Sequence, residues 1–200
     1  MQTPTRFFAN SRAVTTSARR GFTLIELLMV VTVTSIMVAV VAPKFRISEA
    51  MEVQLAGMQL VQDVDFVRTR ALAARSLSRV KFDNSSTAAY TGYLDTDADS
   101  TLAETAAERL ELHGFGRREL PRNVAFGRGS VPAIPNDASS SAITFAGSKV
   151  DFNSRGIVQP MGQGGVVYLK HTVKPSVAVA VAVSPAGNVR LWTYKNGSWQ

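Results

Sequence analysis

The chain has 200 residues, a formal net charge of +7 and no cysteine. The missing cysteines exclude disulfides, cysteine-ligated metal sites and thiol nucleophiles. Four of the basic residues, Arg6, Arg12, Arg19 and Arg20, lie in residues 1–21, which carry no acidic residue. The net charge is therefore partly a property of the amino end, and by itself it does not indicate a nucleic-acid-binding protein.

A charge-free apolar segment follows the basic residues, with no Asp, Glu, Lys or Arg from Leu27 to Pro43. With Phe22 to Ile25 added, it approaches the roughly 20 residues that a helix needs to cross a bilayer core. In lipid the backbone must satisfy its own hydrogen bonds, so we expect a helix over residues 22–43 despite many β-branched residues. The carboxylate of Glu26 is costly in this setting, and we expect it to have a partner.

The stretch Arg20-Gly21-Phe22-Thr23-Leu24-Ile25-Glu26, followed by an apolar run, resembles the type III signal of type IV pilins and type II secretion pseudopilins. The resemblance implies cleavage between Gly21 and Phe22 by a prepilin peptidase and N-methylation of Phe22. The mature chain would be held by its helix, first in the bacterial inner membrane and later in a filament. Because basic residues precede the helix, the head is expected in the periplasm.

The resemblance further implies that Glu26 pairs with the Phe22 amine of an adjacent pilin subunit, and that the inner-membrane assembly platform is another partner. Without a partner, Glu26 would instead reach the membrane interface. Pro43 matches the position where pilin helices bend, or it simply ends the membrane span. An ordinary secretory signal peptide, cleaved near residues 40–42, remains an alternative, but it leaves Glu26 and the Gly21–Phe22 junction unexplained.

Residues 44–76 predict an amphipathic continuation of this helix into water. Apolar residues recur at spacings of three, four and seven, at Val53, Leu60, Val64, Val67, Ala71 and Ala74. Polar residues, including Asp63, are expected on the remaining surface, and Gly57 is the weak point for helix formation. We expect the apolar stripe to pack against a sheet.

Residues 77–200 predict a β-rich head. Short strand-like segments are expected at residues 79–82, 89–94, 109–112, 120–126, 142–145, 150–152 and 166–170, with a loop at 127–141. The clearest hairpin alternates Val and Ala from Val177 to Val183, turns through residues 184–187 and returns to Tyr194. The fold class is therefore α+β, with a long amino-terminal helix, membrane-spanning in its first half, on an antiparallel, sandwich-like head.

The order of residues in the carboxy-terminal half is similar to that of GspH/FimT-type minor pseudopilins. It comprises Phe152, Gly156, a strand, and then the stretch Val181 to Arg190, which contains Ser184-Pro185-x-Gly187. The expected organisation is a cleaved leader (1–21), a transmembrane or filament-core helix (22–43), an amphipathic helix (44–76) and a periplasmic head (77–200). The resemblance implies a minor subunit in or near a filament tip.

Asp95, Asp97 and Asp99 partly match a calcium loop, the one cofactor that the sequence suggests. Ser100 replaces the expected glycine, and Ala106 stands at the twelfth position instead of Glu. The alternative is a solvated acidic turn.

Arg190, Trp192 and Tyr194 alternate on one face of the last long strand, with Lys195 nearby. This composition suits single-stranded nucleic acid, and FimT-type minor pilins include DNA receptors with a Gly-Arg-x-Arg element here. In this chain Asn188 replaces the first arginine. Alternatively, the aromatic side chains pack on the sheet or the helix and Arg190 caps an edge.

The two histidines, His113 and His171, belong to no metal-ligand or hydrolase motif, so the sequence does not predict an enzyme. Our leading hypothesis is a minor pseudopilin that assembles with other pseudopilins in a type II secretion system. The alternative is a minor pilin of a type IV pilus involved in DNA uptake or adhesion. A membrane-tethered periplasmic enzyme is a third hypothesis.

Overall fold

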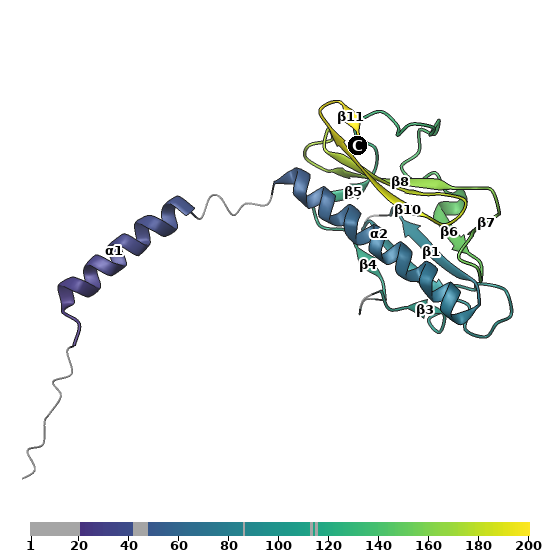
Figure 1. The fold of residues 1–200 in the computed structure, drawn as a ribbon, viewed down its shortest axis with the longest axis horizontal. Helices are drawn as coiled ribbons and strands as arrows, with labels where there is room; N and C mark the ends of the chain where they lie inside the picture. Colours follow the sequence, from purple (N-terminus) through teal and green to yellow (C-terminus); the bar gives the residue numbers. More distant parts are fainter. Residues whose placement is uncertain (1–20, 42–47, 86, 113, 115) are drawn as a thin grey trace, which may run out of the picture. The chain divides into compact units, whose positions relative to one another are not determined.

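The computed structural model describes residues 21–41, 48–85, 87–112, 114 and 116–200 (Figure 1). The chain divides into two compact units, residues 1–46 and residues 47–200, which are described separately. Pro43 and His113 lie outside the described residues.

In the first unit, helix α1 spans Leu24–Val41. The hydroxyl of Thr23 accepts a hydrogen bond from the backbone N–H of Glu26 at 3.2 Å, which caps the first turn. Hydroxyls within the helix bond back to carbonyls of the preceding turn, as Ser35 does to Val31 at 2.7 Å. Every residue of α1 is exposed, and its mean hydropathy of 2.5 over 18 residues suits a membrane span.

In the second unit, helix α2 spans Glu49–Ala74. The Ser48 hydroxyl caps its start by accepting from the Met51 N–H, and Arg75 ends it in the left-handed conformation, with φ 54°. Five residues of the predicted apolar stripe are buried: Val53, Leu60, Val64, Val67 and Ala71. The sixth, Ala74, is exposed, because α2 ends there.

The described strands form two antiparallel sheets. The first has the order β3 (Arg109–Leu110), β2 (Ala89–Leu94), β1 (Ser78–Asp83), β6 (Lys149–Phe152), β7 (Val158–Gln159), and β4 (Arg118–Glu119) also pairs with β2. The second has the order β11 (Ser198–Trp199), β10 (Val189–Lys195), β9 (Ala178–Val183), β8 (Gly165–His171), β5 (Val124–Phe126). Helix α2 contacts strands of both sheets, and its apolar stripe joins their side chains in one core. The expected α+β class with an antiparallel head is confirmed.

The predicted hairpin is present as β9 and β10, with Val183 opposite Val189 and Gly187 turning the chain at φ 86°. The prediction of a strand at residues 142–145 is wrong. Ile143 forms only an isolated bridge with Val167, and a 3₁₀ turn, η2 (Ala146–Ser148), follows. Thr144 bonds to β8 through its side chain, since its hydroxyl accepts a hydrogen bond from the Val166 N–H at 2.7 Å.

A second apolar cluster includes Tyr168 and Ala180, and Trp192 and Trp199 pack against it. The loop at residues 127–141 is held there, because the indole N–H of Trp199 donates to the Pro132 carbonyl at 3.1 Å. The Tyr168 hydroxyl also accepts from the Ile134 N–H at 3.1 Å. Neighbouring residues of a strand point to opposite faces, so this cluster lies opposite the α2 face, where Leu191 approaches Gly57.

Candidate functional site

The amino end of the described chain presents the predicted processing junction. A Cβ added at Gly21 would meet no atom of the described residues within 4 Å, so the described fold does not require glycine at this position. Phe22 is 82% exposed. A requirement for glycine here would therefore come from something outside the chain, such as a processing enzyme that reads the backbone at close range.

Glu26 is exposed on the first turn of α1. Within the described part of the chain, its carboxylate makes no hydrogen bond or ion pair. Thr23 and Glu26 stand at the spacing of a capping box, and the Thr23 half of it is formed. Sequence reasoning missed this cap, although Thr-x-x-Glu before an apolar run is its signature.

A buried ion pair in the head was also missed. Asp63 is 1% exposed, and its Oδ2 lies 2.7 Å from the Nε of Arg118 on β4. The Tyr90 hydroxyl donates to the same oxygen at 2.7 Å. Burial, and then this bond to Asp63, raise the pKa of Tyr90. The expectation that Asp63 lies on the polar surface is wrong, because it stands three residues after Leu60 and shares its helix face.

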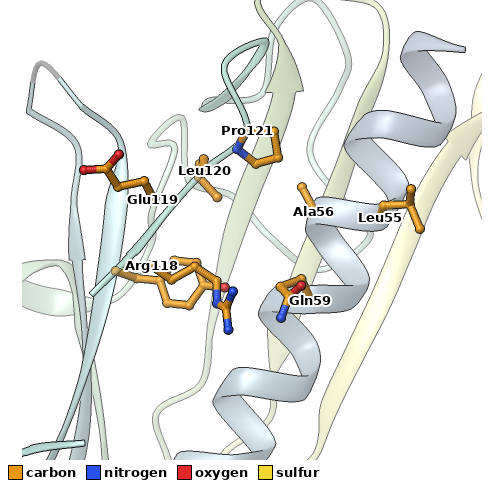
Figure 2. Close-up of a pocket in the computed structure, with 8 residues that line it drawn as sticks. Leu55, Ala56, Gln59, Arg118, Glu119, Leu120 and Pro121 are labelled. Atoms are coloured by element: carbon orange, nitrogen blue, oxygen red, sulfur yellow. The ribbon is translucent and has the colours of Figure 1, made fainter. Parts of the chain in front are cut away.

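A pocket of about 220 Å³ opens beside this pair, between α2 and residues 118–121 (Figure 2). Figure 2 shows Arg118 extending from its strand toward α2, with its guanidinium facing Gln59. Leu55, Ala56, Leu120 and Pro121 supply the apolar part of the lining. Because Arg118 is already paired with Asp63, this arrangement supports the packing of α2 and does not present a reactive group.

The three aspartates of the partial calcium motif lie together after β2. Their carboxylate oxygens lie within 4.8 Å of one another. Asp95 is buried, whereas Asp97 and Asp99 are exposed. Contact with the Asp95 side chain raises the pKa of Asp97, because a proton on Asp97 can be shared with the Asp95 carboxylate, and the negative charge of Asp99 adds to the shift.

The structure brings the residues of the predicted DNA surface only partly together. The Arg190 guanidinium stacks over the Trp192 ring, 4.0 Å from its centroid, and Arg190 is exposed. Strand alternation places Lys195 on the other face of β10. Trp192 is half-buried against the second cluster, which is the packing arrangement left open as the alternative.

His171 is buried, and its ring is occupied by structural contacts. Its Nδ1 accepts from the backbone N–H groups of Val173 and Lys174, at 3.3 and 3.1 Å. Its Nε2 lies 3.6 Å from Glu52. These contacts fix the turn after β8, as expected of a lone structural histidine.

Comparison with known proteins finds one family model that matches the amino end of the chain. Residues 16–42 match the prokaryotic N-terminal methylation motif, which confirms the prepilin-type resemblance of the amino end. No curated protein matches the chain with significance.

Solved structures similar to the chain include a minor pilin and a minor pseudopilin. The type IV minor pilin FimU of Pseudomonas aeruginosa PAO1 has a TM-score of 0.48 at 12% identity, covering 74% of this chain and 92% of that one. The minor pseudopilin EpsH from the type 2 secretion system of Vibrio cholerae has a TM-score of 0.46 at 12% identity, covering 71% and 97%.

Proposed function

We propose that the chain is a minor pseudopilin of a type II secretion system, matured by a prepilin peptidase and assembled at the tip of a pseudopilus that exports proteins. The observation that carries this proposal is the methylation motif over residues 16–42. In this stretch Gly21 directly precedes the exposed Phe22 and the apolar helix α1, and the described fold does not itself require a glycine there.

Helix α1 supports the anchoring step. All its side chains are exposed in this single chain, although 18 consecutive residues carry only one charge. Apolar surface on this scale needs cover from lipid or from other apolar helices. The inner membrane would supply the cover before assembly, with the head in the periplasm, and neighbouring subunits would supply it afterwards. Pro43 would let the helix bend during this transfer.

Glu26 supports the assembly step. In a complete capping box the Glu26 carboxylate would accept from the backbone N–H of Thr23, but among the described residues only the bond from the Glu26 N–H to the Thr23 hydroxyl is formed, so the carboxylate is available for a contact outside the chain. Cleavage after Gly21 would create an α-amine on Phe22, and an unpaired charge in an apolar filament core is costly. The Glu26 carboxylate of one subunit would neutralise the Phe22 amine of the next and set the axial register.

Processing is tested by co-expressing the full chain with a prepilin peptidase and measuring the mature protein by mass spectrometry. We expect an amino terminus at N-methylated Phe22. Gly21→Val is the matched control and should remain unprocessed, because a Cβ at this position meets no atom of the described residues within 4 Å and the change should not disturb the fold. An amino terminus elsewhere, or equal processing of the control, would contradict the proposal.

Assembly is tested with Glu26→Ala in a reconstituted pseudopilus. We expect normal cleavage and lost incorporation into sheared filaments. Asp65→Ala removes an exposed acid from α2 and should assemble normally. If Glu26→Ala is incorporated as well as the control, Glu26 does not set the axial register.

The second candidate is a minor pilin of a type IV pilus that takes up DNA, and the exposed Arg190 stacked on Trp192 favours it. A gel shift with DNA at low salt tests this, since phosphate contacts weaken steeply as salt rises. Arg190→Gln should then lose binding, whereas Arg155→Gln, which removes another exposed arginine, should not. No shift at low salt would favour the secretion function.

A further inference from the structure

We infer that Asp95, Asp97 and Asp99 form a binding site for a divalent cation of the calcium type, beside the carboxyl end of α2. The inference does not depend on the proposed function. It starts from the three carboxylates, each of which offers an oxygen within 4.8 Å of the others.

The loop is folded to hold this arrangement. Ala98 and Ser100 adopt left-handed conformations, with φ 59° and 64°, which turn the chain tightly around the acidic side chains. The Ser100 N–H donates to Asp95 Oδ2 at 3.1 Å. The backbone and hydroxyl of Thr101 both donate to Asp99 Oδ1 at 2.7 Å. One oxygen of each of these two carboxylates is thus oriented by the loop itself.

Buried oxygens without donors point independently to a missing ligand. Asp95 is only 4% exposed, and within the described residues its Oδ1 has no hydrogen-bond partner. The hydroxyl of Ser76, from the segment after α2, is likewise buried without a partner. Both residues line the same pocket of about 190 Å³, together with Ala98 and Ser100 of the loop. A buried carboxylate oxygen with no donor is costly, and a bound cation would satisfy it.

The local charge also favours a cation. The last turn of α2 ends at this pocket, and a helix carboxyl end carries partial negative charge. Arg75 lines the pocket, but among the described ion pairs none joins it to the three aspartates. The nearby Arg79 is occupied by Asp151, at 2.6 Å, and by Glu104. The repulsion between Asp95 and Asp97 is therefore not offset by a protein cation.

The donor set selects the class of ion. It consists of carboxylate and hydroxyl oxygens, which suit hard cations such as Ca²⁺. Few charged ligands and no bidentate Glu at the twelfth position predict weak binding, with a Kd of about 10⁻⁴ to 10⁻³ M, the range of extracellular calcium modules. Such an ion would connect the loop after β2 to the segment that follows α2.

The test is calorimetric titration of the detergent-solubilised full chain with CaCl₂, paired with thermal unfolding. We expect binding of one ion per chain and a higher Tm. Asp97→Asn, at an exposed position that should not disturb folding, is expected to weaken binding at least about tenfold by removing one charged ligand. Asp65→Asn makes the same chemical change at an exposed site on α2 and should bind like the parent chain.

Two outcomes would overturn the inference. One is the absence of heat and of any Tm shift at about 10 mM CaCl₂, well above the expected Kd. The other is equal calcium binding by Asp97→Asn and Asp65→Asn, which would indicate non-specific association with the acidic surface. A calcium-dependent rise in Tm that is lost in Asp97→Asn and kept in Asp65→Asn supports the site.

Discussion

Helices α1 and α2 carry similar numbers of apolar side chains but differ in where those side chains find partners. Helix α1 is apolar all round and fully exposed within its own unit. Helix α2 gathers its apolar residues on one face and buries them against both sheets. A one-sided stripe can be satisfied inside the chain, whereas an all-round apolar helix calls for lipid or other subunits.

The same contrast separates Asp63 of α2 from Glu26 of α1, two carboxylates that stand beside apolar residues. Asp63 of α2 is buried and meets Arg118 and Tyr90 of the same chain. The Glu26 carboxylate of α1 meets no described residue. The first carboxylate therefore serves the stability of the head, and the second is left for a contact outside the chain.

The largest effect is expected from Asp63→Ala. It removes the acceptor shared by Arg118 and Tyr90, and breaking a buried pair typically lowers the free energy of unfolding by about 3–5 kcal/mol. Urea unfolding followed by tryptophan fluorescence measures this, because Trp192 and Trp199 both lie in the head. Asp65→Ala, two residues along, is the control and should cost about 0–1 kcal/mol. Equal costs would show that the pair does not stabilise the head.

Leucines of the two helices give the next comparison. Leu60 is 0% exposed, so Leu60→Ala should lower the free energy of unfolding by about 2–5 kcal/mol through lost burial and a cavity. Leu28 is 52% exposed, and Leu28→Ala should change head stability by less than about 0.5 kcal/mol. The same urea titration measures the free energy of unfolding of both variants. A large loss from Leu28→Ala would mean that α1 packs on the head in solution.

The next comparison is between Gly57, inside α2, and Gly21, which precedes α1. At Gly57 an added Cβ would lie 2.8 Å from side-chain atoms of Val179 and Leu191. Gly57→Ala should therefore cost about 1–3 kcal/mol by overpacking, although alanine favours an isolated helix by about 1 kcal/mol. The added methyl of Gly21→Ala meets no atom within 4 Å in the described part of the chain, so this change should leave the stability of the head unchanged. A stabilised Gly57→Ala chain would show that α2 shifts away from β9 and β10 at little cost.

The amino end, the α2 stripe and the β9–β10 hairpin could be predicted because each is a local pattern of residue types. The partners of Asp63 could not, since Arg118 lies far along the chain and helical spacing gives no pairing across sheets. The three aspartates were visible as a motif. That Asp95 and Ser76 line one pocket depends on how the end of α2 meets the loop after β2, which only the folded chain determines.

A partly exposed ion pair should have the smallest effect. Partial burial would raise the pKa of Glu104. Its bonds to Lys81 and Arg79 outweigh this effect and lower the pKa. A carboxylate with a lowered folded-state pKa contributes stability above its unfolded-state pKa and loses it as pH falls through the folded value. Glu104→Gln should thus cost about 0.2–1 kcal/mol at neutral pH, and the difference from the parent chain should vanish in acid.

Urea titrations at neutral and acidic pH test this expectation, with Glu111→Gln as the control. Glu111 is exposed, and among the described ion pairs it takes part in none, so its substitution should change little at either pH. A cost of Glu104→Gln that persists unchanged in acid would mean that Glu104 acts by packing and not by charge. The contact would then resemble the buried stripe of α2 and not a screened surface pair.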